Sequence, residues 1–209
     1  MKNITIREYQ KSDYPACEEL VNQAWKFDQI FRSLNLRKLA KKLYTEGSLV
    51  SSNFKIVAED DYGIAGFIFG LNKNKKKPRG ALLFGVKATL DLNFKKMDRA
   101  EKRKLVTAIT VHSKNRSAAD PRKVSEIILF VISERCRGSG IGTELWQVFR
   151  EYCQNSGIEE IRVETNRDGA SGFYEKLGFE FLVNFDSPLH ELATPAGQAC
   201  IYNYEHQRS

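Results

Sequence analysis

The stretch at residues 134–143 reads ERCRGSGIGT, and three of its ten residues are glycines. It follows IILFVIS (127–133), an apolar run that predicts a buried strand, and precedes ELWQVFREYC (144–153), whose apolar residues recur at helical spacing. The first amides of a helix have no intrahelical acceptor, and the helix dipole adds partial positive charge at that end. The stretch therefore predicts an anion-binding turn, to which Arg137 adds a cation and Thr143 a hydroxyl.

The spacing of Gly138, Gly140 and Gly142 excludes two phosphate-binding motifs. In the dinucleotide fingerprint G-x-G-x-x-G, the third glycine would fall at Thr143 or at Leu145, so that motif does not fit. The nucleotide-triphosphate loop needs Gly-Lys-Ser/Thr, which this sequence lacks. Taken alone, the three glycines are equally typical of a tight turn, because glycine adopts conformations that other residues avoid.

The segments around this stretch predict alternating strands and helices. Helical spacing predicts a first helix, capped by Ser12 or Asp13, that reaches Trp25, and a short second helix that ends before Gly47. It also predicts helices at 99–112, 140–157 and 169–178. Strand-like runs occupy 54–59, 64–70, 126–133, 158–165, 179–185 and 199–205; the first two flank DDYG (60–63), a hairpin signal. The order predicts one domain of the α/β (α+β) class over residues 1–209.

Residues 71–122 form the least regular part of the sequence. The segment opens with LNKNKKKPRG, which predicts a solvated lysine-rich loop. We expect His112 on the surface of the 99–112 helix or at an interface rather than as a catalytic base, with no partner evident from the sequence. A loop with Pro188 and Pro195 is expected between the last two strands.

Composition limits the class of protein. The 42% hydrophobic content of the 209 residues excludes general disorder, and no apolar run approaches the roughly 20 residues of a membrane span. The N-terminus lacks an apolar secretory core, so we expect a cytoplasmic protein. The formal charge of +7 permits a nucleic acid or an anionic small molecule as ligand. Scattered cysteines predict free thiols and no metal site: Cys17, Cys136, Cys153 and Cys200.

Two motifs in this order resemble a known family. RGSGIG (137–142) is similar to the Arg/Gln-x-x-Gly-x-Gly/Ala loop of the GNAT superfamily of acyl-CoA-dependent N-acetyltransferases. TNRDGASGFYEKLGFE (165–180) resembles the second half of that signature, so the match covers roughly 126–181. The resemblance implies a central mixed, mostly antiparallel twisted sheet flanked by helices, a variable insertion at about 71–122, acetyl-CoA as donor, and no metal.

The resemblance also implies roles for individual residues. The pantetheine arm of the donor would run beside Val131, Ile132 and Ser133, with an amide near Ile132 facing the thioester oxygen. Asn166 and Phe173 would contact the donor as well. The diphosphate would lie on seven consecutive residues: Arg137, Gly138, Ser139, Gly140, Ile141, Gly142 and Thr143.

Two residues are candidates for proton transfer. The resemblance implies that Tyr174 gives a proton to the departing thiolate, although its helical spacing with Phe173 and Leu177 is equally typical of a core stripe. Glu134, where many members of the family have proline, is the best-placed candidate for a general base, or else a solvated carboxylate. The carboxylates at 59–61 are alternatives that would attract a cationic acceptor.

The sequence thus predicts an enzyme that transfers acetyl from acetyl-CoA to a primary amine by direct attack in a ternary complex. The acceptor is a small molecule or a peptide, and no nucleic acid or membrane partner is expected; a homodimer is consistent with the family. The alternative is a catalytically silent acyl-CoA-binding regulatory module. A nucleic-acid binder that uses KNKKKPRG (73–80) is disfavoured because the run has no interleaved aromatic residues.

Overall fold

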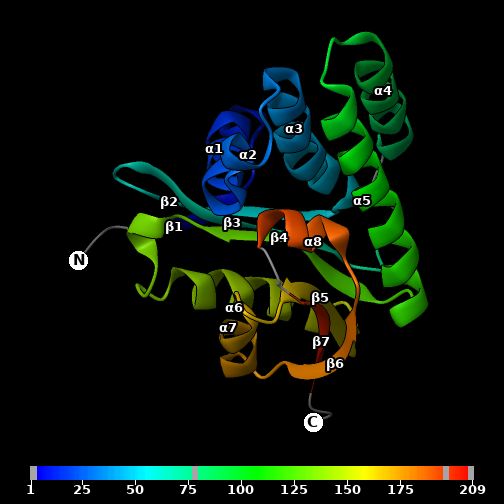
Figure 1. Ribbon diagram of the computed structural model, residues 1–209. Coiled ribbons are helices and arrows are strands. Elements are labelled where there is room, and N and C mark those ends of the chain that lie inside the picture. Colours follow the sequence, from blue (N-terminus) through cyan, green and yellow to red (C-terminus); the bar gives the residue numbers. More distant parts are fainter. Residues whose placement is uncertain (1–3, 77–79, 195–197, 207–209) are drawn as a thin grey trace.

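The computed structural model describes residues 4–76, 80–194 and 198–206. Their strands form one sheet in the order β1-β2-β3-β4-β5-β7-β6 (Figure 1). The bounds are β1 Thr5–Glu8, β2 Phe54–Asp60, β3 Gly63–Leu71, β4 Ser125–Ile132, β5 Glu160–Asn166, β6 Glu180–Phe185 and β7 Ala199–Glu205. Neighbouring strands are antiparallel except β4 and β5, which are parallel. The predicted mixed, mostly antiparallel sheet is confirmed.

Helices cover both faces of this sheet (Figure 1). Their bounds are α1 Tyr14–Trp25, α2 Phe27–Ile30, α3 Leu34–Ser51, α4 Ala81–Phe94, α5 Arg99–Ala119, α6 Ile141–Gln154, α7 Ser171–Lys176 and α8 Pro188–Ala193, with 3₁₀ turns η1 Lys11–Asp13 and η2 Glu134–Cys136. One core lies between the sheet and α6 and α7, and contains Trp146 and Phe149. The other lies under α1, α3 and α5, and contains Leu36 and Leu105. A helix layer on each face is what a sheet with two apolar faces requires.

The β2–β3 hairpin forms as predicted. Asp60 pairs with Gly63 across the turn, and Gly63 has φ +104°, a conformation that favours glycine. The register shifts between Ala58 and Glu59, so the hairpin contains a bulge near its tip.

The prediction that the second helix ends before Gly47 is wrong, because α3 continues to Ser51. The ring of Phe84 in α4 explains the glycine. A Cβ built on Gly47 would lie 3.3 Å from Phe84 Cε1, so the missing side chain lets α4 pack closely on α3. Glycine here serves close packing rather than helix termination.

Further helical segments were not predicted, among them the short α2 at Phe27–Ile30. α4 lies inside the irregular 71–122 segment, and its apolar residues are spread too widely around the helix for a periodic signal. α5 continues past His112 to Ala119. α8 occupies the expected loop between the last two strands, with Pro188 in its first turn and the Ser187 side chain as its N-cap; Pro195 lies outside the described residues.

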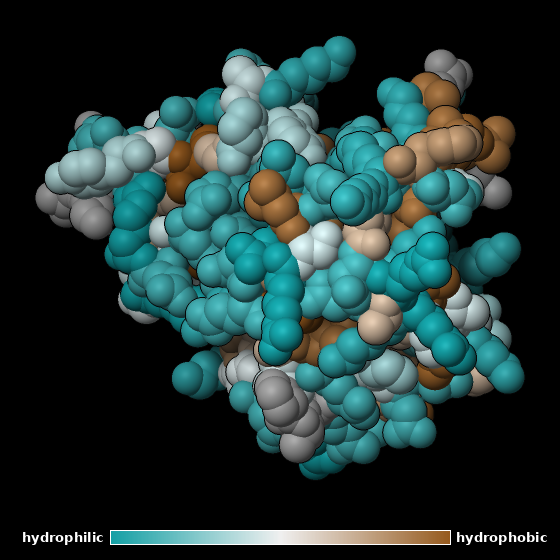
Figure 2. Space-filling model, turned by 45° about the horizontal axis from the view of Figure 1, so that its top comes forward, coloured by the Kyte–Doolittle hydropathy of each residue, from teal (hydrophilic) through white to brown (hydrophobic). Residues whose placement is uncertain are grey.

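α4 carries an exposed apolar surface. Apolar side chains gather over this helix at the upper right of Figure 2. Leu82 and Phe94 are the most exposed, at 84% and 82%, and Leu83, Val86 and Leu90 are also exposed. In the part of the chain that the structure describes, no helix has both the length and the apolar character to cross a bilayer.

Beside α4, the described part of the predicted lysine-rich loop, Lys73 to Lys76, is exposed, whereas 77–79 lie outside the described residues. All four cysteines are free thiols, as predicted, and all four are buried.

The sheet opens between β4 and β5. These strands pair at Ser125↔Ile161, Glu126↔Arg162 and Ile127↔Val163, and the pairing ends there. β4 nevertheless continues to Ile132 and β5 to Asn166, so the two strands diverge toward their carboxyl ends (Figure 1). The predicted site residues lie along and beyond this divergence.

Candidate active site

The glycine loop joins the end of β4 to the start of α6. After η2, Gly138 and Gly140 adopt φ values of +77° and +91°, and Ile141 begins the helix. A Cβ built on either glycine would have no heavy atom within 4 Å, so both positions face open space. The positive φ values explain why the loop needs glycine, and the open space leaves its backbone accessible.

The amides of this loop are available to a ligand. In the described ranges, no hydrogen bond uses the N–H groups of Gly138, Gly140, Ile141, Gly142 or Thr143 as donors, whereas Ser139 N–H donates to the Cys136 carbonyl (3.3 Å). The first three helical amides are without acceptors because of helix geometry, and no side chain caps them. Free amides at the N-terminus of a 14-residue helix, with the exposed Arg137 beside them, are the groups that an anion site requires.

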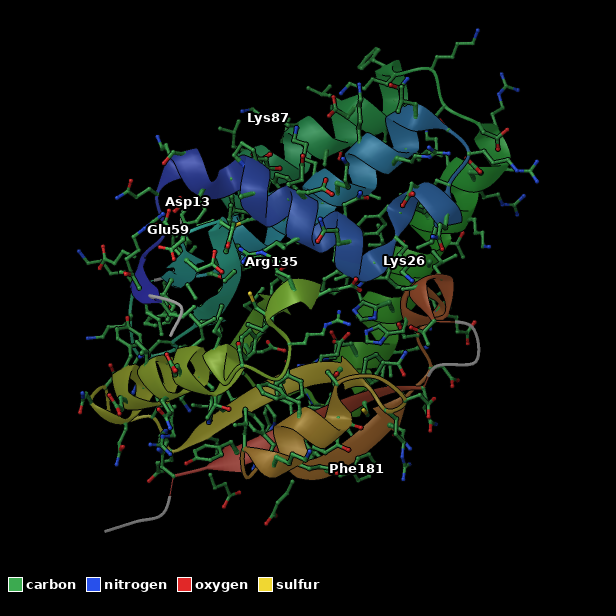
Figure 3. All side chains as sticks on the ribbon, turned by 90° about the vertical axis from the view of Figure 1, so that its left-hand side faces the viewer. Asp13, Lys26, Glu59, Lys87, Arg135 and Phe181 are labelled. Carbon is green, nitrogen blue, oxygen red and sulfur yellow. The ribbon has the colours of Figure 1, made fainter. Side chains whose placement is uncertain are left out.

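An ion pair with a buried carboxylate fixes the turn before the loop. Arg135 in η2 reaches the carboxylate of Asp60 at the end of β2, with Nη2 2.9 Å from Oδ1 and Nη1 bound to Oδ2. Figure 3 shows Arg135 at the turn between β4 and α6, pointing toward the β2–β3 half of the sheet. The Asp60 side chain is fully buried, so this pair ties the loop to the hairpin.

The edge of β4 that faces the opening has free backbone groups. Ser133 N–H donates to Ala65 O of β3 (2.8 Å), so it points toward β3. Backbone groups alternate between the two edges of a strand, which directs the N–H groups of Ile132 and Phe130 to the other edge. There β5 has already diverged, since pairing ends at Ile127↔Val163. Two β4 amides therefore face the opening.

Phe173 packs between the loop and β4. Its ring centroid lies 5.7 Å from that of Phe130, and a Cβ on Gly142 would be 3.1 Å from Phe173 Cζ and 3.6 Å from Ile132 Cγ1. The structure thus brings together three residues that the sequence assigned to donor binding: Ile132, Gly142 and Phe173. Gly142 is required here by close packing, not by its φ value.

Tyr174 lies in the core beneath α6 and is 5% exposed. Its ring packs against Phe173 and Phe179, each with centroids 5.4 Å away. Burial raises the pKa of its phenol, so the hydroxyl keeps its proton at neutral pH. That hydroxyl has no hydrogen-bond partner among the described residues, and Tyr174 is therefore an unengaged proton donor.

Asn166 and Glu134 have polar partners close in sequence. Asn166 Oδ1 accepts from Asp168 N–H (3.3 Å), which leaves its amino group for another acceptor. The carboxylate of Glu134 lies 3.6 Å from Arg137 Nη1, and both side chains are more than half exposed. Val131 and Ser133 are buried, and Ser139 and Thr143 are exposed.

The hairpin carboxylates are largely engaged. Glu59 accepts from Arg7 (2.8 Å), which also binds Asp13, and Asp60 is held by Arg135. Asp13 and Glu59 lie on the same side of the molecule in Figure 3. A hollow of about 450 Å³ is lined by α1 and α3 residues, including Tyr14 and Lys38, and lies away from the glycine loop.

The structure also contains a polar cluster that the sequence did not predict. His112 of α5, Glu164 of β5 and His190 of α8 place three polar atoms within 4.8 Å of one another. Glu164 Oε1 lies 2.7 Å from His190 Nε2 and 3.6 Å from His112 Nε2, and the imidazoles stack at 12° with centroids 5.9 Å apart. Arg116 binds Glu164 Oε2 (3.1 Å) and Glu126 Oε1 (2.7 Å).

His112 therefore has partners that the sequence did not reveal. Its Nδ1 lies 2.9 Å from Ser187 Oγ in addition to the Glu164 contact. The partners come from positions more than 50 residues away, and the sequence gives no signal for such contacts. The alternation of β5, which exposes Glu164 on the face opposite Val163, is the one feature that indicates where it points.

Burial and charge determine the protonation of this cluster. Burial lowers the pKa of His112, which favours the neutral imidazole. Burial opposes ionisation of Glu164, but the His190 hydrogen bond and the neighbouring cations outweigh it and lower the pKa of Glu164. Burial raises the pKa of Glu126 although Arg116 acts against it. The cluster thus combines a neutral His112 with an ionised Glu164.

Comparisons with known proteins agree with this geometry. A sequence model described as the Acetyltransferase (GNAT) family matches residues 93–179. N-alpha-acetyltransferase 30 of Schizosaccharomyces pombe is 42% identical over 55 residues, which are 25% of this chain and 37% of that protein. The match thus spans little more than a third of the length of this curated relative.

Two solved structures share the fold. yncA from Salmonella typhimurium, solved with its cofactor acetyl-CoA, is 12% identical with a TM-score of 0.54, and the alignment covers 99% of this chain and 96% of that one. A GCN5-related N-acetyltransferase from Kribbella flavida is 14% identical with a TM-score of 0.54, over 97% and 98% of the two chains. At these identities the likeness concerns the fold alone.

Proposed function

Because the chain belongs to the GNAT superfamily of acetyltransferases, we propose that it transfers an acetyl group from acetyl-CoA to a primary amine by direct attack in a ternary complex. The observation that carries the proposal is the set of free amides at Gly138 and at 140–143, placed directly beyond the open edge of β4. The donor contains a diphosphate followed by an arm with amide groups. The loop amides suit the diphosphate, and the unpaired edge of β4 suits the arm.

The glycine loop holds the diphosphate of the donor. Its free amides and the helix dipole supply partial positive charge, and Arg137 supplies a full one. The open space at Gly138 and Gly140 allows phosphate oxygens to approach the backbone. The pantetheine arm follows β4 past Val131 and Ser133, flanked by Phe173, and the Asn166 amino group donates to it.

The β4 edge stabilises the reacting carbonyl. The N–H of Ile132, with that of Phe130 one alternation earlier, is fixed by the strand and faces the opening. A thioester bound there supplies an electrophilic carbonyl carbon, and a rigid amide near its oxygen stabilises the negative charge that develops. Loss of one such donor typically lowers the rate by about 100- to 1,000-fold.

Tyr174 protonates the leaving group. The amine nitrogen forms the new C–N bond with its lone pair, the C–S bond breaks with its electrons on sulfur, and the Tyr174 proton moves to that sulfur. The proton that the amine loses restores the tyrosine through a base or water, so the products are an amide and free CoA thiol. Glu134 is one candidate for this base because of its position after β4. Side chains on the other face of the sheet are the alternative candidates.

The acceptor that we propose is a peptide or protein amine. The relative from Schizosaccharomyces pombe is named an N-alpha-acetyltransferase, which supports an α-amine at a peptide N-terminus over a small-molecule amine. We further infer that the helices between β3 and β4 are an insertion in one domain. β3 and β4 are antiparallel neighbours with Leu71 opposite Glu126, so a short turn would suffice to join them.

The test measures thiol release from acetyl-CoA with a panel of amines: peptides with free N-termini, N-blocked peptides with a free lysine, and polyamines. The expected result is amine-dependent thiol release with a product that carries one added acetyl group. Tight acetyl-CoA binding without release across the panel would favour the regulatory module. No binding of acetyl-CoA would refute both.

A further inference from the structure

The His112–Glu164–His190 cluster lies beside the opening in the sheet, on the face opposite the glycine loop. Ile161 and Val163 of β5 belong to the core beneath α6, so alternation places Glu164 on the other face. Glu164 is also the first β5 residue after the last β4–β5 pair, Ile127↔Val163. An anion cradle and a titratable cluster thus lie on the two faces of one opening.

Groups from five elements face this cluster. α5 contributes His112 and Arg116, β4 contributes Glu126, β5 contributes Glu164, and α8 with its N-cap contributes His190 and Ser187. α3 contributes Tyr44, whose phenol pKa is raised by burial and also by the charge on Glu164. The two carboxylates, Glu126 and Glu164, and the guanidinium of Arg116 carry a formal charge of −1 before the histidines are counted. That local charge is opposite in sign to the +7 of the chain and favours a cationic ligand.

The two imidazoles are not equivalent. His190 Nε2 is at hydrogen-bond distance from Glu164 Oε1 (2.7 Å), whereas His112 Nε2 lies 3.6 Å from the same oxygen. The longer distance exceeds a direct hydrogen bond, so an N–H donor can bind Glu164 and His112 together. His112 Nδ1 lies 2.9 Å from Ser187 Oγ, which already accepts from His190 N–H (3.1 Å); in the tautomer that carries its proton on Nδ1, His112 donates to this oxygen and keeps the lone pair on Nε2.

We propose that this cluster binds the acceptor as an ammonium ion and removes its proton, with Glu164 holding the cation and His112 Nε2 accepting the proton. The step is RNH₃⁺ + His → RNH₂ + HisH⁺, and it leaves the amine lone pair free for attack through the opening. The imidazolium is then stabilised by Glu164 while Arg116 fixes that carboxylate. This inference rests on the proposed function and adds the base and the ammonium subsite to it.

The chemistry of the base selects an acceptor class. A peptide α-amine has a pKa of about 8 and a lysine side chain about 10.4, against about 6.5 for histidine. Proton transfer to His112 is therefore far less unfavourable from an α-amine than from a lysine. The cluster fits a peptide N-terminus.

The experiment follows kcat/KM against pH from 5.5 to 9 for acetylation of a peptide α-amine, in wild type, His112→Asn, His112→Gln, Glu164→Gln and the control His206→Asn. His206 lies at the end of the described chain, outside the cluster, and burial lowers its pKa too. We expect His112→Asn to lose about 100-fold or more at pH 7 and much less at pH 9, where the amine deprotonates in solution. Glu164→Gln should raise KM for the amine more than it lowers kcat.

Melting temperature and acetyl-CoA affinity establish that each variant is folded and binds the donor; His112→Gln serves if the asparagine variant does not fold. A His112 variant whose kcat/KM follows the wild-type pH profile, or falls by the same factor at every pH, would overturn the base assignment. Turnover by the wild type would still support the proposed transferase function. Activity that a chelator abolishes and zinc restores would overturn it in favour of a metal site. A wild type inactive with every amine would refute the proposed function and this inference with it.

Discussion

The guanidinium of Arg135 is held by the carboxylate of Asp60, with Nη2 2.9 Å from Oδ1, and this contact joins two segments 75 residues apart. The Asp60 side chain is fully buried, and that of Arg135 is 34% exposed. Tyr62 covers the outer side of the guanidinium, with its ring centroid 5.8 Å from Arg135 Cζ. The guanidinium of Arg135 thus ties the end of β4 to the β2–β3 hairpin, and Arg137 is left as the cation beside the loop amides.

Arg135→Ala is expected to destabilise the fold. It removes the guanidinium from a buried carboxylate, which typically costs about 1–3 kcal/mol. Thermal unfolding measures the effect. The matched control is Arg137→Ala, an exposed arginine of the loop, which should leave the melting temperature nearly unchanged and weaken acetyl-CoA binding instead. Equal melting temperatures for the two variants would show that the Asp60 contact contributes nothing to the loop.

Tyr174→Phe should lower turnover and leave donor affinity nearly unchanged. The variant keeps the ring that packs on Phe173 and Phe179 and removes a hydroxyl without a partner among the described residues. Its stability should therefore match or exceed that of wild type, while loss of a general acid lowers kcat by roughly 100-fold. Steady-state thiol release and calorimetry with acetyl-CoA separate the two effects. Wild-type turnover would remove Tyr174 from the mechanism.

Alanine at two glycines should have opposite effects on stability. A Cβ on Gly70 would lie 2.4 Å from the buried Phe149 ring, so Gly70→Ala overpacks the core and costs about 1–3 kcal/mol. Gly85, in the exposed middle of α4, has no heavy atom within 4 Å of such a Cβ, so Gly85→Ala stabilises by about 0.5–1 kcal/mol. Urea unfolding of both variants measures the contrast. A Gly85→Ala variant less stable than wild type would argue against a helix at this position.

Stability should fall as the solution is acidified from pH 7.5 to 5.5. The folded-state pKa of His112 lies below its unfolded value of about 6.5, so between these values the unfolded chain binds more protons. His112 therefore contributes stability at neutral pH and loses it as pH falls. The raised pKa of Glu126 gives a slope of opposite sign, starting near pH 4.5, and the lowered pKa of Glu164 acts below that.

The difference between wild type and His112→Asn isolates the histidine. We expect the unfolding free energy of wild type to fall by roughly 1 kcal/mol more than that of the variant over this range. Chemical unfolding at several pH values provides the measurement. Parallel curves would mean that His112 is not buried as a neutral imidazole.

The downstream half of the fold could be predicted from the sequence because its signals are local. The strand, the glycine turn and the helix from 126 to 157 follow from apolar runs and from glycines that need positive φ, and Gly138 and Gly140 have it. The antiparallel hairpin at 60–63 follows from the same kind of signal. Other glycines are required by close packing, which has no local signal. For this reason the prediction that a helix ends before Gly47 was wrong.

The rest depended on contacts between distant residues. α4 has apolar residues on most of its surface, so periodicity could not reveal it. The polar cluster needs α5, β5 and α8 to meet, and no spacing in the sequence places His112 beside Glu164. The loop residues assigned to donor binding come together as expected, but their role in binding stays a prediction.

The most direct test of the central claim is calorimetric titration of acetyl-CoA into wild type, Gly138→Asn and Gly138→Asp. Both side chains tolerate the left-handed backbone at this position and have nearly the same shape, and they differ in charge. If a diphosphate lies on the amides of 138–143, the asparagine variant should bind a few-fold more weakly than wild type and the aspartate variant at least 10-fold more weakly than asparagine. Equal affinities for the two variants would contradict the account, because a negative charge in the cradle would then make no difference to the donor.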